Sequence, residues 1–209
     1  MDRSRSRRAF LASAATTVGV TAGGFEYDSS KTNSSLESGT VPDGWYECNE
    51  VTRPDPDAPS DENALEPRTY PSPPSSLLDG ESGGSTDRSS PSGNTASAGE
   101  YVTAFEQVYR RNAFVARYGG VTRTFEFRLD ARRTSPVGSD TDPAAVLVAL
   151  VYDLTTETRR SPPNDEWDIR VTYYLDENVL LRAQYEGIAD KPSVTPDPRR
   201  QGDLVACFQ

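Results

Sequence analysis

The regular spacing of hydrophobic residues begins near residue 97 of the chain. Beyond it, large apolar side chains first recur every three or four positions, the spacing of one helix face; they are Tyr101, Phe105 and Val108. The preceding stretch, Ser97 to Glu100, matches the capping box S-x-x-E. The pattern therefore predicts a helix over residues 98–114, before the Gly119-Gly120 pair.

Four later segments have the pattern of β-strands. Residues 121–131, 167–173 and 179–185 alternate apolar and polar positions, as expected for strands with one face in water. Residues 144–154 are almost continuously apolar, which is typical of a central strand. The polar residues 176–178 lie between the last two strands and indicate a β-hairpin.

These elements predict one small α+β domain over residues 98–209. A helix that packs across a four-stranded antiparallel meander buries one face of the sheet. This order of elements resembles cystatin-like and nuclear-transport-factor-like folds, and the resemblance is one of pattern only. A proline-rich tail, ending in Leu204 to Phe208, follows the fourth strand.

Residues 25–97 have the composition of a disordered linker rich in Ser, Pro, Gly and Asp. Such a segment cannot bury enough apolar surface to offset the entropy lost on ordering. One aromatic island interrupts it, and this island contains Trp45, Tyr46 and Cys48. A disulfide would pin the island onto the domain; the alternative is a stray aromatic pair in a disordered segment.

Acidic residues outnumber basic ones by 32 to 22, and Lys31 and Lys191 are the only lysines. Removing residues 1–24, which contain four arginines and Asp2, leaves a formal charge of −13. Self-repulsion destabilises so charged a domain unless salt screens it, and the Debye length is only about 3 Å at 1 M. The composition favours a protein of a salt-loving organism over an ordinary acidic secreted protein.

The chain contains no histidine, which excludes histidine-based nucleophile activation, proton shuttling and zinc ligation. Its two cysteines, Cys48 and Cys207, are too few for a four-cysteine metal site. They are either free thiols or one disulfide.

Residues 1–24 combine a basic start, an uncharged apolar middle and a small-residue end. The stretch is too short and too weakly apolar to be a good membrane-spanning helix. It resembles a twin-arginine export signal, whose motif residues here are Ser6, Arg7, Arg8, Phe10 and Leu11. The alternative is an ordinary N-terminal helix. We therefore expect the export machinery as a partner, and an extracellular or cell-surface location.

Export bears on the cysteines and on anchoring. In an oxidising compartment two cysteines pair more often than they stay free. A Cys48–Cys207 bond would stabilise the fold by roughly 5 kcal/mol in the chain-entropy model. Gly24 stands where similar exported lipoproteins carry a lipid-modified cysteine, so we expect a released product.

Four looser motifs accompany the signal: "PRTYPSPPSSL", "EYVTAFEQVYRRN", "LRAQYEG" and "PDPRRQGDLVAC". Together they resemble small, uncharacterised proteins that haloarchaea export by the twin-arginine route. The resemblance implies export and a small α+β domain, and it implies no known activity.

Candidate chemistry is weak throughout the chain. Carboxylates that could form an acid–base pair are Glu126, Asp153, Asp168 and Glu186. Oxygen-rich runs that suggest calcium are Asp55, Asp57, Asp61 and Glu62, and also Asp140 and Asp142, but neither run fits an EF-hand. Four arginine pairs are better explained as solvated or salt-bridged than as nucleic-acid contacts, because the net charge is negative. We assign no catalytic, cofactor-binding or metal-binding residue.

Two functions are consistent with these patterns. The first is an exported, non-enzymatic binding or cell-surface module that is held beyond a flexible tether. The second is a small-ligand-binding or hydrolytic domain that uses a pocket between the helix and the sheet.

The export hypothesis makes the first testable prediction. Replacing Arg7 and Arg8 by lysine should leave the precursor in the cytoplasm, because the paired arginines carry the signal. Fractionation of cells that express each form measures the outcome. Normal secretion of the lysine variant would overturn the hypothesis.

Overall fold

The computed structural model describes residues 39–42, 44–74, 91–139, 142–185, 187 and 191–208. The export motif, Gly24 and residues 25–38, 43 and 75–90 of the expected linker lie outside these residues.

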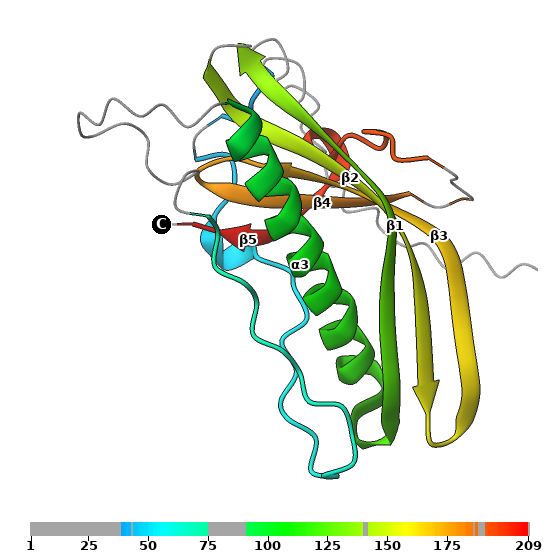
Figure 1. Ribbon diagram of the computed structural model, residues 1–209. Coiled ribbons are helices and arrows are strands. Elements are labelled where there is room, and N and C mark those ends of the chain that lie inside the picture. The colour runs from blue at the N-terminus through cyan, green and yellow to red at the C-terminus, as the bar shows by residue number, and fades with distance from the viewer. Residues whose placement is uncertain are drawn as a thin grey trace, which may run out of the picture.

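One long helix packs on a twisted antiparallel sheet (Figure 1), which confirms the predicted α+β class. The helix α3 spans Pro91–Tyr118, and the sheet order is β1-β2-β3-β4-β5, so each strand pairs with its neighbour in sequence. The strands are β1 (Thr122–Ser139), β2 (Asp142–Thr158), β3 (Ser161–Leu175), β4 (Val179–Tyr185) and β5 (Asp203–Cys207). The short helices are η1 (Cys48–Glu50), η2 (Gly119–Val121) and α4 (Pro198–Gln201).

The helix begins earlier than the capping box predicts. Pro91 is its first residue, a position that suits proline because its fixed φ is helical and its missing N–H would have no partner there. Ser97 lies inside the helix, so its assignment as the N-cap is wrong. Among the described residues, no helix is both long and apolar enough to cross a membrane.

The prediction of four strands is also wrong, because the expected tail contains a fifth. β5 is antiparallel to β4, with Val179 opposite Cys207 and Leu181 opposite Leu204. Its central residues 204–206 are buried. A five-residue strand is too short to show a clear alternation in the sequence, and its pairing with β4 decides its conformation.

Both faces of the sheet are covered near β4. The face under α3 buries an apolar cluster that includes Phe105, Leu150 and Tyr173. The opposite face buries Leu147, Tyr174 and Leu181 beneath a second segment of the chain. Burial on both faces explains why β2 is almost continuously apolar, as predicted for a central strand.

That second segment belongs to the expected linker. Val41, Trp45 and Tyr46 pack on the second cluster, and the Val41 amide donates a hydrogen bond to the Tyr174 hydroxyl at 3.0 Å. A disulfide joins Cys48 to Cys207 across 159 positions, with the Cα atoms 5.4 Å apart. The interpretation of the aromatic island as a pinned segment is confirmed.

Residues 52–74 continue as an extended segment along the domain. The Thr52 amide donates to the Leu204 carbonyl at 2.8 Å, and the Asn112 side chain bonds both backbone groups of Arg68 at 2.8 and 2.9 Å. Tyr70 lies against Phe105, with ring centroids 4.8 Å apart. This part of the expected linker is therefore not an exposed tether, because backbone hydrogen bonds and ring contacts hold it on α3 and β5.

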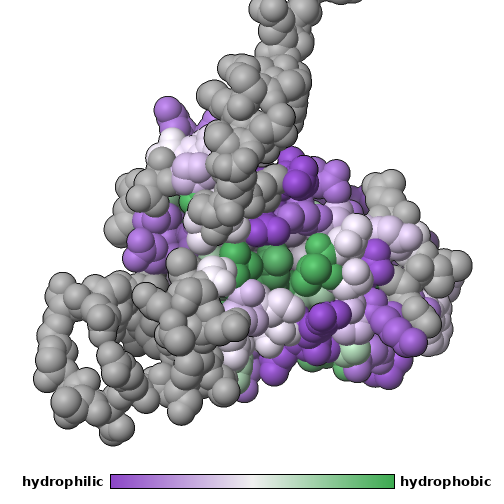
Figure 2. All heavy atoms as spheres, turned by 90° about the horizontal axis from the view of Figure 1, so that it is seen from above, coloured by the Kyte–Doolittle hydropathy of each residue, from purple (hydrophilic) through white to green (hydrophobic). Residues whose placement is uncertain are grey.

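The surface is largely hydrophilic. Seen from above, one hydrophobic strip lies at the centre of the face between hydrophilic side chains (Figure 2). The large hydrophobic residues that are exposed among the described ones are Tyr118, Leu129 and Trp167, and Trp167 is 68% exposed.

A buried ion pair joins the helix to the sheet. Glu106 of α3 is fully buried, and the Arg182 guanidinium of β4 donates to both of its carboxylate oxygens at 2.9 Å. The hydroxyls of Tyr152 and Tyr173 donate to the same carboxylate, the first at 2.5 Å. Arg182 also lies over the ring of Tyr109, 4.4 Å from its centroid. One carboxylate therefore connects α3, β2, β3 and β4.

The surroundings of this carboxylate keep it ionised. Burial by itself raises the pKa of Glu106, but the charge of Arg182 and the hydrogen bonds lower it by more, so the net direction is downward. The contribution of the pair to stability is present above the ordinary glutamate pKa of about 4.3. It is lost as the pH falls through the lowered pKa of the folded state.

Removing one partner of this pair should be costly. Glu106→Gln leaves the Arg182 charge buried without its counter-charge, and we expect a loss of about 3–5 kcal/mol in the free energy of unfolding, measured by urea denaturation. Glu100→Gln, on the exposed part of the same helix, is the matched control and should change it by less than about 0.5 kcal/mol. Equal urea midpoints for the two variants would contradict the structural role.

Removal of the disulfide should also destabilise the fold. Cys48→Ala with Cys207→Ala should lower the free energy of unfolding by about 2–5 kcal/mol, since the unfolded chain loses a long closed loop. It should also speed proteolysis of residues 44–51, which the bond holds on the sheet. Non-reducing mass analysis of the parent protein is the companion measurement, and two free thiols there would rule the bond out.

Candidate functional site

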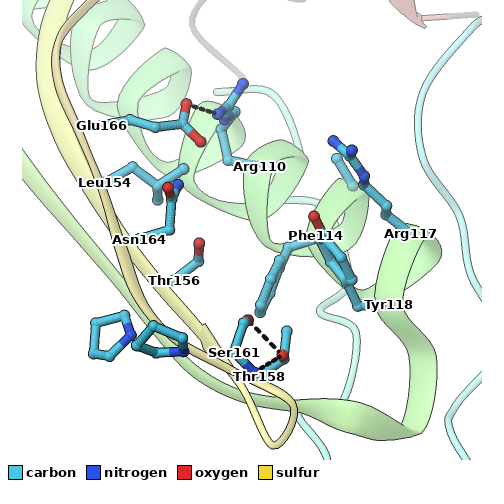
Figure 3. Close-up of a pocket in the computed structure, with 13 residues that line it drawn as sticks. Arg110, Phe114, Arg117, Tyr118, Leu154, Thr156, Thr158, Ser161, Asn164 and Glu166 are labelled. Atoms are coloured by element: carbon cyan, nitrogen blue, oxygen red, sulfur yellow. Dashed lines mark hydrogen bonds and ion pairs between the residues drawn. The ribbon is translucent and has the colours of Figure 1, made fainter. Parts of the chain in front are cut away.

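A groove lies between the C-terminal half of α3 and the hairpin of β2 and β3 (Figure 3). Its volume is about 520 Å³, within the range of small-molecule sites. From α3 it is lined by Arg110, Ala113, Phe114, Arg117 and Tyr118. From the hairpin it is lined by Leu154, Thr156, Thr158, Ser161, Pro162, Pro163, Asn164 and Glu166.

The groove follows from the different lengths of neighbouring strands. β4 pairs only with residues 170–175 of β3, and there the helix covers a filled core. Beyond that point the sheet continues as β1, β2 and β3, and α3 packs on β1 and β2. The extended hairpin end of β3 therefore forms one wall of a hollow instead of another layer of core.

The two walls differ in chemistry. Phe114 extends from the helix side toward Ser161 and Thr158, while Leu154, Thr156 and Asn164 lie on the strand side (Figure 3). The Thr158 and Ser161 hydroxyls are hydrogen-bonded to each other at 2.8 Å. Two prolines, Pro162 and Pro163, complete the strand wall. A ligand here would meet flat apolar surfaces and several neutral hydrogen-bonding groups.

One ion pair closes the upper end of the groove. Arg110 donates to Glu166 at 2.9 Å (Figure 3), with side chains 18% and 44% exposed. Of the residues that line the groove, Glu166 is the one carboxylate. Arg117 lies at the rim, with its guanidinium 5.2 Å from the centre of the Tyr118 ring.

A second hollow of about 430 Å³ adjoins the groove at the hairpin end. The two share Thr158, Ser161 and Pro162, and the second is also lined by Arg123, Glu157, Arg159 and Arg160. Arg123 and Arg159 both bond one carboxylate, Asp61, at 3.2 and 3.3 Å. The backbone N–H of Asn63 and these two arginines lower the pKa of Asp61. Arginines thus outnumber carboxylates at this end.

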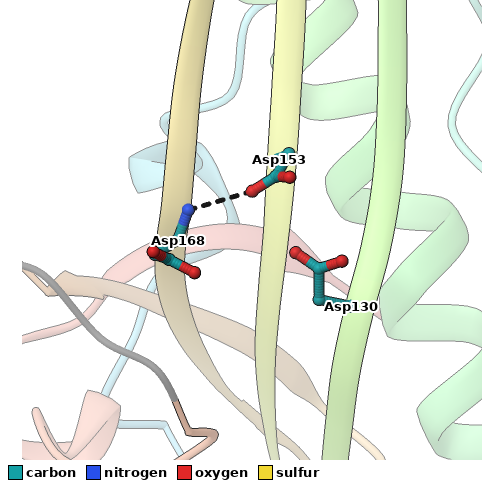
Figure 4. Close-up of side chains that lie close together, drawn as sticks. All are labelled: Asp130, Asp153 and Asp168. Carbon is teal, nitrogen blue, oxygen red and sulfur yellow. Dashed lines mark hydrogen bonds between the residues drawn. The ribbon is translucent and has the colours of Figure 1, made fainter.

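Two of the candidate acid–base carboxylates, Asp153 and Asp168, come together, and neither lines the groove. Asp153 lies between Asp168 and Asp130 on three neighbouring strands (Figure 4), with oxygens of the three within 4.8 Å of one another. The Asp168 amide donates to Asp153 at 3.0 Å, and Arg128 bonds Asp153 and Asp130.

Their environment does not fit acid–base catalysis. Burial raises the pKa of Asp153, but the Asp168 amide and Arg128 lower it by more. A carboxylate with a lowered pKa is a poor general acid. Because Arg128 neutralises part of the cluster, we assign it no metal.

The other candidate residues do not converge. Glu126 is exposed on β1, and Glu186 and Asp140 lie outside the described residues. Asp55 and Asp57 lie on the extended segment, Glu62 lies near Asp61, and Asp142 begins β2. The candidate calcium residues are therefore spread over separate parts of the fold.

Comparison of the chain with protein-family models, with curated proteins and with solved structures finds no match. A functional assignment therefore depends on the chemistry of the groove.

Sequence reasoning missed the groove residues. Thr156 and Thr158 extend the alternation of β2 beyond residue 154, where the predicted strand ends, and this signal could have placed them on the helix-facing side. The predicted third strand begins only at residue 167, because the two prolines and the acidic residues in 162–166 are typical of a loop. Only their pairing with β2 places Asn164 and Glu166 beside the helix.

Proposed function

We propose that this protein is an exported, non-enzymatic module that binds a small ligand in the groove between α3 and the β2–β3 hairpin. The observation that carries the proposal is the groove itself, a hollow of about 520 Å³ whose lining combines apolar side chains with neutral polar groups and one ion pair. Concave sites with mostly apolar walls and a few fixed polar groups are the usual form of small-molecule sites. The proposal combines the two functions that the sequence patterns suggest: an exported binding module, and a ligand pocket between the helix and the sheet.

Binding is better supported than hydrolysis. Carboxylate-based hydrolysis needs two carboxylates in different protonation states, and in the groove lining Glu166 is alone and bonded to Arg110. The Thr158 and Ser161 hydroxyls bond each other, and the chain has no histidine to activate either.

The excess of acidic residues supports the hypothesis that the protein works in high salt. Carboxylates outnumber basic side chains by 32 to 22, and in high salt screening limits the repulsion between them. Ligand contacts that depend on shape and neutral hydrogen bonds keep their strength in salt, whereas long-range charge attraction does not. The chemistry of the groove walls suits such conditions.

Filling the groove tests this function. We expect Ala113→Trp to abolish binding of any probe that shifts amide resonances of residues 154–166, because Ala113 lines the groove. Ala96→Trp, at an exposed position of the same helix, is the matched control and should leave binding unchanged. The measurement is a titration of the labelled protein in high salt with saccharides, benzoate and inorganic phosphate.

If none of these probes perturbs the groove residues, the proposed function is wrong. If a probe binds equally well to both tryptophan variants, its site lies elsewhere and the groove has no role in binding it.

A further inference from the structure

The polar atoms of the groove both donate and accept hydrogen bonds. Thr156, Ser161 and Asn164 carry hydroxyl or amide groups, each of which can serve in either role. A ligand whose polar atoms are all carboxylate oxygens only accepts, so it would leave these acceptors without a donor from the ligand. A ligand rich in hydroxyl groups matches them.

The ion pair at the upper end favours the same ligand. Arg110 and Glu166 neutralise each other, so neither is a free charge for an ionic group. Together they offer N–H donors beside a carboxylate acceptor, and two neighbouring hydroxyls of a ligand can satisfy both. Both side chains are partly exposed, so a ligand can reach them.

The Tyr118 ring is 41% exposed and provides an apolar surface for a ligand ring beside the buried Phe114. Phe114 and Tyr118 have ring centroids 5.2 Å apart and planes tilted by 57°. Pro162 and Pro163 lie on the facing wall. A sugar ring presents C–H groups on its faces and hydroxyls at its edge, so it can contact such walls while its edge meets the polar groups.

The adjoining hollow extends the site beyond one ring and changes its charge. It shares three residues with the groove, so one elongated ligand can occupy both. The Arg160 side chain is exposed and makes no ion pair within the described residues. In a chain of net charge −10, a local excess of arginine favours an acidic group of the ligand at this end.

We infer that the ligand is an oligosaccharide that contains an acidic sugar. Its rings lie between Tyr118 and the proline wall, and its acidic group lies at the hairpin end against Arg160. This inference rests on the proposed function, because it names the class of ligand for the same groove.

The test uses one pair of probes with the same sugar rings, trigalacturonate and its trimethyl ester, in which all three carboxylates are uncharged methyl esters. Both should shift the amide resonances of residues 154–166 in the parent protein. Trigalacturonate should bind about two- to fivefold more tightly, the range of one solvent-exposed ion pair. Arg160→Gln should remove this difference, and Arg200→Gln, an exposed arginine on α4 with a similar side chain, should preserve it.

Cellotriose, maltotriose, benzoate and inorganic phosphate complete the set of probes. If benzoate or phosphate binds at the groove and no saccharide does, this inference is wrong and the proposed function stands. If no probe binds there, both are wrong. If saccharides bind but the acid and its ester bind equally, the acidic sugar is excluded and a neutral oligosaccharide replaces it.

Discussion

The buried pair of Glu106 and Arg182 is the interaction on which the arrangement of helix and sheet depends. A charged carboxylate has no place inside an apolar core unless its oxygens are bonded, and here a guanidinium and two tyrosine hydroxyls bond them. These partners come from three different strands, so only one position of α3 satisfies them all. Apolar contacts alone would tolerate small shifts of the helix, since they are not directional.

This anchoring has a direct consequence for the groove. Arg110 lies one helical turn after Glu106 on the same side of α3, and Phe114 lies one turn further. Near Glu106 the helix faces β4 and the space is filled. One turn further along α3, the part of β3 opposite the helix has no β4 partner, because β4 ends at Tyr185. There the same helix face meets an open hollow. The buried pair therefore sets the distance and the direction from which the helix side chains approach the hairpin.

The segment before the helix shows how a polar chain can still be ordered. Residues 39–74 contain few apolar side chains, yet Trp45, Tyr46 and Tyr70 each contact a core cluster. The disulfide holds one end of this segment on β5, which lowers the entropy that the remaining contacts must offset. The composition of this segment is that of a linker, because a few aromatic residues and one cysteine change an average over many polar residues very little. Their contacts and the disulfide nevertheless hold the segment on the domain.

The sequence by itself determined the α+β class, the existence of four of the five strands and the interior position of β2, because helix and strand periodicity are local properties. It also showed that Cys48 and Cys207 could pair. Only the tertiary structure decided where α3 begins, that residues 203–207 form a fifth strand, and that Asn164 and Glu166 face Phe114 across a groove. Those features depend on the pairing of residues that lie far apart in sequence and on the end of β4, and no local pattern encodes them.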